Sequence, residues 1–257
     1  GATITLRRDG ERWVIAERGD FPADFTKVRN FVLAALALKI GQSEPIGPAE
    51  RTRLRLDEPT AKEGGGTLVV FGAGADKPLA SVIVGRKYFR RTPDDPKNAK
   101  GDGRFVLRPD AANTAIIVAD PLEQAGAKSA LWIDRRAFAA DEPISIDVRH
   151  ADGDHWHIER GPNAGDKWKL ADLKPGEKLA ENTVVSIAAA AGGLDLAEVF
   201  ARDAQREAKA LAKPTVITTV TRDGLTYTLK VGDEGGGNRL AVGTIQGKLP
   251  AARKPVP

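Results

Sequence analysis

All three histidines of this chain, His150, His155 and His157, lie within one short stretch, HADGDHWHIER. Imidazole nitrogens bind transition metals and act as general acids and bases near neutral pH. Three of them this close together could therefore form a metal site or a catalytic cluster. Whether they form such a site depends on which side chains the local secondary structure places on one face.

The histidines flank an Asp-Gly pair between two alternating segments, which is typical of a β-hairpin. A two-residue turn at Asp-Gly would place all three imidazoles on one face. That register puts Ile146 and Val148 on the face opposite Trp156 and Ile158, because a one-residue shift moves every side chain of a strand to the other face. A three-residue loop at 151–153 restores the agreement, so we predict this loop, with its glycine in the left-handed conformation.

In the predicted register His155 and His157 share the outer face with Asp147 and Arg149, while His150 turns to the other face near the loop. This pattern argues against a three-histidine site. A metal site made of His155, His157 and Asp147 is an alternative, and with it a metal-dependent hydrolase. Convergence of both rings on Asp147 would favour that interpretation, and divergence would exclude it.

Two further stretches, DGERWVIAER at 9–18 and DGLTYTLK at 223–230, share the pattern of the histidine hairpin. Each has Asp-Gly, two residues, an aromatic residue, one more residue and an aliphatic residue, so a ring and a branched chain face one side of the second strand. We expect a two-residue turn at 9–10 that pairs Leu6 with Trp13. The third hairpin is expected to work in the same way, with these side chains facing inward: Val216, Val220, Tyr227, Leu229 and Val231.

Helical spacing of apolar residues predicts a helix within residues 21–40, where Asp24 is placed to cap the N-terminus. An Ala-rich helix is expected within residues 174–200, ending at the glycine pair 192–193. A third helix is expected from about Asp195 to Ala212.

Strand-rich blocks at 64–85 and 215–245 follow these hairpins and helices. The order of hairpin, helix and antiparallel strands thus occurs twice, with a division near residue 140. The predicted fold is α+β, mainly β with about three helices. It consists of two tandem copies of a hairpin–helix–antiparallel-strand unit, at 1–140 and 141–257.

The charge balance, with 39 Lys and Arg against 35 Asp and Glu, is mildly basic, and both signs are mixed along the chain. Nucleic-acid binding is not expected, since it needs a concentrated basic patch. The chain has no cysteine, which excludes disulfides and thiolate metal sites. No P-loop, dinucleotide fingerprint or nucleophile elbow is present, and we expect neither a catalytic residue nor a cofactor.

No apolar run approaches the length of a membrane-spanning helix. The chain begins with Gly1 and holds no methionine, so we expect it to be a processed or truncated product with a segment upstream of Gly1 removed.

Two tryptophans, Trp132 in LWIDRR and Trp168 in KWKL, fall outside the hairpin pattern and are free to be exposed. Exposed aromatic rings stack on sugars and other planar ligands. These two residues are therefore candidates for a glycan- or small-ligand-binding module, which would use the cleft between the two copies.

A set of structural motifs follows the same order as in a known bacterial family. The chain starts with a strand–turn–Trp hairpin, then FPAD, then a helix ending in LALK. It continues with LRLDEP, LASVIVG, LWIDRR, ISIDV and TRDGLTYTL. In this order the motifs resemble the family called domain of unknown function 4340, over most of the chain.

The resemblance implies an envelope protein with an N-terminal membrane anchor and a large domain outside the cytoplasm. Such proteins are often linked with ABC-type transport systems similar to those implicated in gliding motility. The anchor would lie upstream of Gly1 in the inner membrane, and the location would be periplasmic or otherwise extracytoplasmic. The expected function is a non-enzymatic interaction domain of a membrane-anchored accessory protein of a transport or envelope-assembly system, with envelope or transporter proteins as partners.

Overall fold

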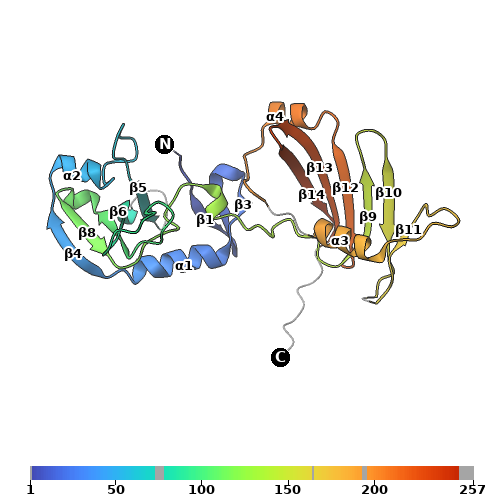
Figure 1. Cartoon of the computed structure of the whole chain (residues 1–257), viewed down its shortest axis with the longest axis horizontal. Coiled ribbons are helices and arrows are strands. Elements are labelled where there is room, and N and C mark those ends of the chain that lie inside the picture. Colours follow the sequence, from blue (N-terminus) through green and yellow to red (C-terminus); the bar gives the residue numbers. More distant parts are fainter. Residues whose placement is uncertain (1, 73–77, 164, 193–195, 249–257) are drawn as a thin grey trace. The chain divides into compact units, whose positions relative to one another are not determined.

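The structure is a computed structural model that describes residues 2–72, 78–163, 165–192 and 196–248. The chain divides into two compact units, Gly1–Asp134 and Arg135–Pro257, and Figure 1 labels most of the helices and strands of each. The division predicted from the sequence lay near residue 140. Both units are built mainly of antiparallel strands, which confirms the α+β, mainly β fold. The described residues hold four α-helices, compared with about three predicted.

The described residues of unit 1 form two sheets. Its elements are β1 (Leu6–Asp9), β2 (Arg12–Ile15), the 3₁₀ turn η1 (Ala16–Arg18), β3 (Phe21–Pro22), α1 (Phe25–Leu36), β4 (Ile40–Pro45), α2 (Pro48–Arg53), β5 (Thr67–Gly72), β6 (Pro78–Tyr88), β7 (Gly103–Leu107), η2 (Pro109–Ala111), β8 (Thr114–Val118) and η3 (Ser129–Leu131). The first three strands form a small sheet, and the other five form a sheet of order β4-β8-β7-β6-β5. All of these strand pairs are antiparallel.

The central part of the larger sheet of unit 1 is buried on both faces. On one face Val84 and Val106 pack with Phe31 of α1. On the other face Ile83 packs with Leu56, which follows α2. Adjacent residues of β6 therefore belong to different clusters, and this two-sided burial explains the continuous apolar run in that strand.

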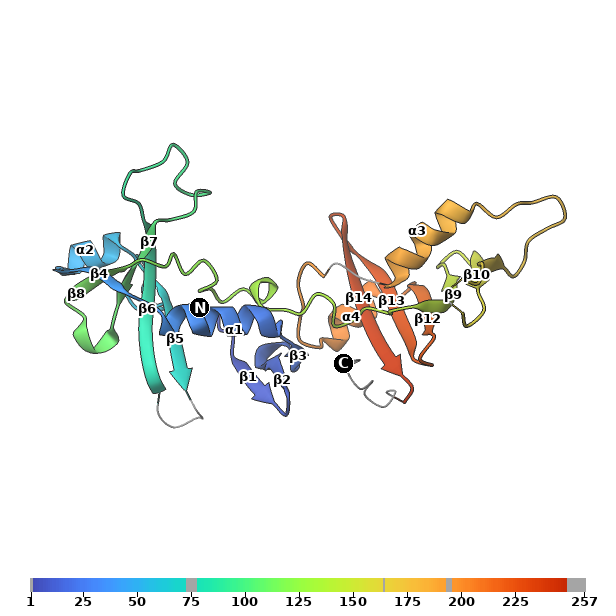
Figure 2. The same ribbon diagram turned by 90° about the horizontal axis from the view of Figure 1, so that it is seen from below.

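The described residues of unit 2 form one six-stranded antiparallel sheet and two α-helices. Its elements are β9 (Pro143–Arg149), β10 (His155–Glu159), β11 (Lys169–Leu170), α3 (Glu181–Gly192), α4 (Ala204–Ala210), β12 (Thr215–Thr221), β13 (Thr226–Gly235) and β14 (Asn238–Gln246). The strand order is β11-β10-β9-β12-β13-β14. Figure 2 shows α3 along one side of this sheet, where Val184 packs with Ile146, Val148 and Ile158.

The two units share an order of elements but differ in sheet topology. In unit 1 the hairpin β1–β2 belongs to a small sheet of its own with β3. In unit 2 the hairpin β9–β10 lies in the same sheet as the late strands β12 to β14.

The turn of the first hairpin is displaced by one residue from the predicted position. Asp9 pairs with Arg12, so the turn residues are Gly10 and Glu11. Gly10 has a φ of 60°, and Glu11 is not among the described residues with positive φ. This is the pattern of a type II′ turn, in which glycine occupies the first turn position. The predicted pairing of Leu6 with the tryptophan was therefore wrong by two residues.

The third hairpin has a three-residue loop at 222–224, and its glycine has a φ of 79°. Leu229 pairs with Ile217. Val216 and Val220 therefore lie on the opposite face from Leu229, and the prediction that they face inward together was wrong. A single extra loop residue is enough to reverse the faces of a strand.

The first helix begins as predicted. The side chain of Asp24 accepts hydrogen bonds from the backbone nitrogens of Thr26 at 2.9 Å and Lys27 at 3.2 Å, which satisfies two of the donors that a helix start leaves free. The Ala-rich helix α3 reaches the predicted Gly192, while residue 193 lies outside the described residues. No helix in the described part of the chain is long and apolar enough to cross a membrane.

The third predicted helix is much shorter than expected. It begins at Ala204, and residues 196–203 are not helical, while Asp195 lies outside the described residues. The side chain of Asp203 accepts hydrogen bonds from the backbone nitrogens of Gln205 and Arg206, each at 3.0 Å. The helix starts at this cap because the carboxylate satisfies the first free donors there.

Candidate functional site

The histidine hairpin β9–β10 has the predicted register. Val148 pairs with Trp156, and Asp147 pairs with His157. The loop spans residues 151–153, and its glycine has a φ of 95°. The three-residue loop is confirmed, so the apolar residues of both strands share the face that packs under α3.

The Asp147 carboxylate lies between the two imidazoles. Its Oδ2 is 2.7 Å from Nε2 of His155 and 3.6 Å from Nδ1 of His157. Its Oδ1 accepts a hydrogen bond from Nε of Arg149 at 3.0 Å. The other nitrogen of His157 lies 3.6 Å from the carboxylate of Glu159. Both rings therefore converge on one carboxylate, as the metal hypothesis requires.

The contacts in this group are those of a hydrogen-bonded network. Metal–ligand bonds are about 2.0–2.2 Å long, so two ligands of one ion lie about 3 Å or more apart, farther than the 2.7 Å from His155 to Asp147. In the described part of the chain no three His, Cys, Asp or Glu side chains are arranged to hold a metal ion. His150 is separate, with its Nδ1 3.5 Å from Oγ1 of Thr215. Metal binding by His155, His157 and Asp147 stays a prediction.

The network also sets the protonation of Asp147. Burial raises the pKa of its carboxyl, but hydrogen bonds from His155 and Arg149, with the charge of Arg149, outweigh burial and leave the pKa below its ordinary value. A pKa that is lower in the folded than in the unfolded state stabilises the fold above the unfolded-state pKa. That contribution is lost as the pH falls through the folded-state pKa.

We expect Asp147→Asn to lower the free energy of unfolding by about 1 kcal/mol at neutral pH, because the amide cannot replace the charged acceptor. The difference from the unsubstituted chain should shrink as the pH falls below about 3.9, where aspartate is protonated in the unfolded chain. Urea denaturation over a pH series measures this. The same substitution at the exposed Asp172 is the control, and equal losses at neutral and acid pH would contradict the prediction.

Trp132 does not lie on the surface, so its predicted role in an exposed stacking surface was wrong. Its side chain is 4% exposed, and its Nε1 donates a hydrogen bond to the carbonyl oxygen of Gly126 at 2.9 Å. Its ring meets Phe31 edge to face, with 5.3 Å between centroids. Helix α1 buries this tryptophan, and the sequence pattern contained no sign of that long-range contact.

Trp168 belongs to unit 2 and is half-buried against the core under α3. The guanidinium carbon of Arg160 lies 4.9 Å from its ring centroid, a cation–π arrangement. A role for Trp168 in ligand binding stays a prediction.

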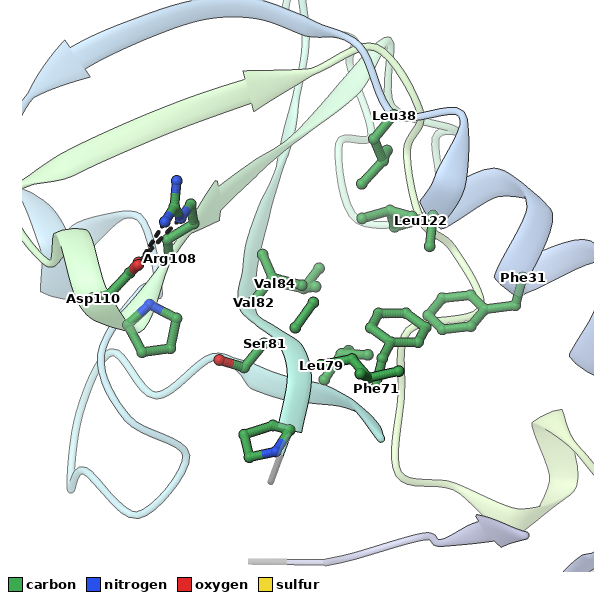
Figure 3. A pocket seen from close by; sticks show the side chains of 15 residues that line it. Phe31, Leu38, Phe71, Leu79, Ser81, Val82, Val84, Arg108, Asp110 and Leu122 are labelled. Atoms are coloured by element: carbon green, nitrogen blue, oxygen red, sulfur yellow. Dashed lines mark hydrogen bonds and ion pairs between the residues drawn. The ribbon is translucent and has the colours of Figure 1, made fainter. Parts of the chain in front are cut away.

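Unit 1 contains a pocket of about 570 Å³, shown in Figure 3. A volume of this size is typical of sites for small ligands or for a few side chains of a partner. The lining residues come from α1, β5, β6, η2 and the segments beside them. They are Phe31, Ala35, Leu38, Val69, Phe71, Pro78, Leu79, Ala80, Ser81, Val82, Val84, Arg108, Pro109, Asp110 and Leu122.

The pocket has an apolar wall and a small polar end. Phe31 and Phe71 stack with 6.2 Å between centroids and 18° between ring planes, and both line the pocket in Figure 3. At the polar end Nε of Arg108 donates a hydrogen bond to Oδ1 of Asp110 at 3.0 Å. This pair neutralises itself, so the pocket offers apolar contact without a net charge.

One edge of β6 is unpaired along the pocket. β5 pairs with β6 from Pro78 to Val84, but β7 pairs with it only from Ile83 onward. β7 stops because Pro109 begins η2, and proline has no N–H for a ladder. Among the described residues, the backbone of 78–82 has no hydrogen-bond partner on the β7 side. The same five residues line the pocket.

Apolar side chains are exposed on β6 and on its partner strand β5. Leu79 is 75% exposed, and Val70 on the neighbouring β5 is 54% exposed. β5 is an edge strand of the sheet, yet apolar residues occupy both of its faces. That feature is visible in the sequence TLVVFG, from which an exposed apolar surface on β5 could have been predicted.

A family model described as "Domain of unknown function (DUF4340)" matches residues 13–186. The match runs from the Trp of the first hairpin, through the pocket and the histidine hairpin, into α3. No curated protein and no solved structure matches the chain.

Proposed function

Because the chain belongs to the DUF4340 family, a family of domains of unknown function, we infer its role from its site. We propose that it is a non-enzymatic interaction domain whose pocket in unit 1 binds an extended apolar segment of a partner protein. The observation that carries the proposal is the unpaired edge of β6 at residues 78–82, which lies along an apolar pocket.

An extended segment fits both features at once. A strand added to a free sheet edge gains main-chain hydrogen bonds, and its alternate side chains enter pockets beside that edge. Here the edge of β6 supplies backbone donors and acceptors, and the wall of Phe31 and Phe71 accepts apolar side chains. Binding would also cover Leu79, which is now 75% exposed, and burial of apolar area stabilises a complex.

The partner in this proposal is an envelope or transporter protein. The domain lies outside the cytoplasm and is held at the inner membrane by an anchor upstream of Gly1, as an accessory part of an ABC-type transport or envelope-assembly system. The support for this part is the resemblance of the sequence motifs to envelope proteins linked with such systems.

Site-specific photo-crosslinking in cells tests the proposal. A photoreactive amino acid replaces Leu79 in the full-length, membrane-anchored protein, and crosslinked products are identified by mass spectrometry. We expect a defined envelope or transporter protein from this position. The control places the same group at Glu11, in the exposed turn of the first hairpin, where we expect no such product. Equal products from both positions, or none from position 79, would contradict the proposal.

A charged residue on the edge gives a second prediction. Leu79→Lys should reduce crosslinking from a photoreactive group at Ser81, which lines the pocket, by about tenfold or more, because a lysine on a strand edge opposes strand addition. Stability should change by less than about 0.5 kcal/mol, since the side chain is 75% exposed. Val185→Lys, at a 60% exposed position of α3 in unit 2, is the matched control and should leave the crosslink intact.

A further inference from the structure

Helix α1 exposes a row of apolar side chains on the side away from the pocket. Phe25 is 58% exposed, Leu33 is 54% exposed and Leu36 is 79% exposed. Their spacing places them on one side of an α-helix. Ile40, just beyond the helix, is 67% exposed. Together Phe25, Leu33, Leu36 and Ile40 are called the outer apolar row below.

The opposite side of α1 makes the contacts by which the helix packs on unit 1. Val28 is 3% exposed, Phe31 packs on the core of the larger sheet, and Ala35 lines the pocket. These contacts use the inner side of the helix, so burial in unit 1 does not explain the outer apolar row. Exposed apolar groups gathered in one place mark a surface that another body covers.

The helical segment that carries the outer apolar row has basic residues and no acidic ones. Arg29 falls within the row by helical spacing, and Lys39 lies next to Ile40, and both are exposed. Residues 25–40 contain no aspartate or glutamate. Among the described residues no ion pair is found for Arg29 or Lys39. Two free cations thus lie among large apolar side chains, with no acidic group in the segment.

We propose that the outer apolar row of α1 binds the surface of a lipid bilayer that contains anionic headgroups. Exposed Phe and Leu side chains of a helix lying in the interface enter the boundary between headgroups and acyl chains. Arginine and lysine on the same helix pair with anionic headgroups, and each basic residue strengthens this attraction. Charge complementarity selects this occupant, because residues 25–40 carry three basic side chains and no acidic one, which matches an anionic surface.

This contact is independent of the proposed protein partner. The pocket is lined by the inner side of α1, including Phe31 and Ala35, whereas the bilayer would cover the outer side. Both surfaces can therefore be occupied at once, and failure of either proposal would leave the other standing.

Co-sedimentation with lipid vesicles tests the inference on the chain of residues 1–257. Vesicles of phosphatidylcholine mixed with phosphatidylglycerol should carry the protein into the pellet. Vesicles of phosphatidylcholine alone should carry much less, and added salt should weaken binding to the mixed vesicles. The double variant Leu33→Ser/Leu36→Ser should bind about tenfold or more weakly, because it removes two of the four inserted side chains.

Leu173→Ser is the matched control. It removes the same kind of side chain from an exposed position, 42% exposed against 54% for Leu33, but in unit 2. It should bind mixed vesicles like the unsubstituted chain. Arg29→Glu leaves the apolar row intact and should lose the preference for phosphatidylglycerol.

Three outcomes would overturn the inference. The first is no binding of the unsubstituted chain to mixed vesicles. The second is equal binding of Leu33→Ser/Leu36→Ser and the unsubstituted chain. The third is self-association of the unsubstituted chain in sedimentation equilibrium that this double variant abolishes, which would assign the row to a second copy. Circular dichroism of each variant checks that the fold is retained.

Discussion

Trp132→Ala is expected to lower the free energy of unfolding of unit 1 by about 3–5 kcal/mol, the range for large aromatic truncations in a core. The side chain is 4% exposed, so the truncation leaves a cavity that the surroundings fill only in part. The variant also loses the edge-to-face contact with Phe31 and the hydrogen bond to Gly126.

Backbone contacts around Trp132 should make the loss of stability larger than the removal of one aromatic ring alone would cause. The carbonyl oxygen of Trp132 accepts a hydrogen bond from the backbone nitrogen of Asp24, the N-cap of α1, at 2.8 Å. Ile133 forms an isolated bridge with Ala23. The segment that carries the tryptophan thus holds the start of α1, and its loosening should also displace Phe31 from the pocket wall. Crosslinking from position 79 should therefore decrease together with the stability of unit 1.

Hydrogen exchange of backbone amides measures this effect for each unit, because two compact units need not unfold together. We expect faster exchange in α1 and in the strands around it, with unit 2 unchanged. Trp168→Ala is the control, since that ring is only half-buried and should cost about 1–2 kcal/mol in unit 2. Equal and small effects of the two substitutions would show that Trp132 does not support the core.

The second hairpin could be predicted because both of its strands carry a clear apolar pattern. Ile146 and Val148 on one strand and Trp156 and Ile158 on the other agree in only one register. The first hairpin lacked this constraint, since a shift of two residues keeps the same faces together. In the third hairpin the sequence of β12 is TVITTVT. Valine and threonine both suit either face of a strand, so this pattern did not distinguish between the possible registers.

Whether a candidate site could be predicted likewise depends on how far apart its residues lie in the sequence. His155, His157 and Asp147 meet within one hairpin, so local register was enough to predict their approach. The pocket depends on where Pro109 ends the pairing of β7 with β6, and on how α1 lies over that sheet. Such contacts join residues far apart in the chain, and periodicity holds no information about them. The burial of Trp132 was mispredicted for the same reason.

Helix α4 packs against β13 at Gly232, a position that only glycine can occupy. We expect Gly232→Ala to destabilise unit 2 by about 3 kcal/mol through overpacking. A Cβ at this position would lie 1.9 Å from the carbonyl oxygen of Ala210 and 2.6 Å from its carbonyl carbon. Both are backbone atoms, so no side-chain rotation relieves the clash. Helix α4 would have to move away from β13, as expected where glycine in a strand permits close approach of another backbone.

Movement of α4 would break further contacts that tie it to the sheet. Nη2 of Arg206 donates a hydrogen bond to Oε2 of Glu234 at 2.9 Å, and Nε of Arg206 donates to the other carboxylate oxygen. Hydrogen exchange should therefore quicken in α4 and in the end of β13 together. Gly165→Ala is the control in the same unit, because nothing lies within 4 Å of its added Cβ. If both variants exchange alike, α4 does not pack on Gly232 in solution, and other contacts, such as the Arg206–Glu234 pair, hold it on the sheet.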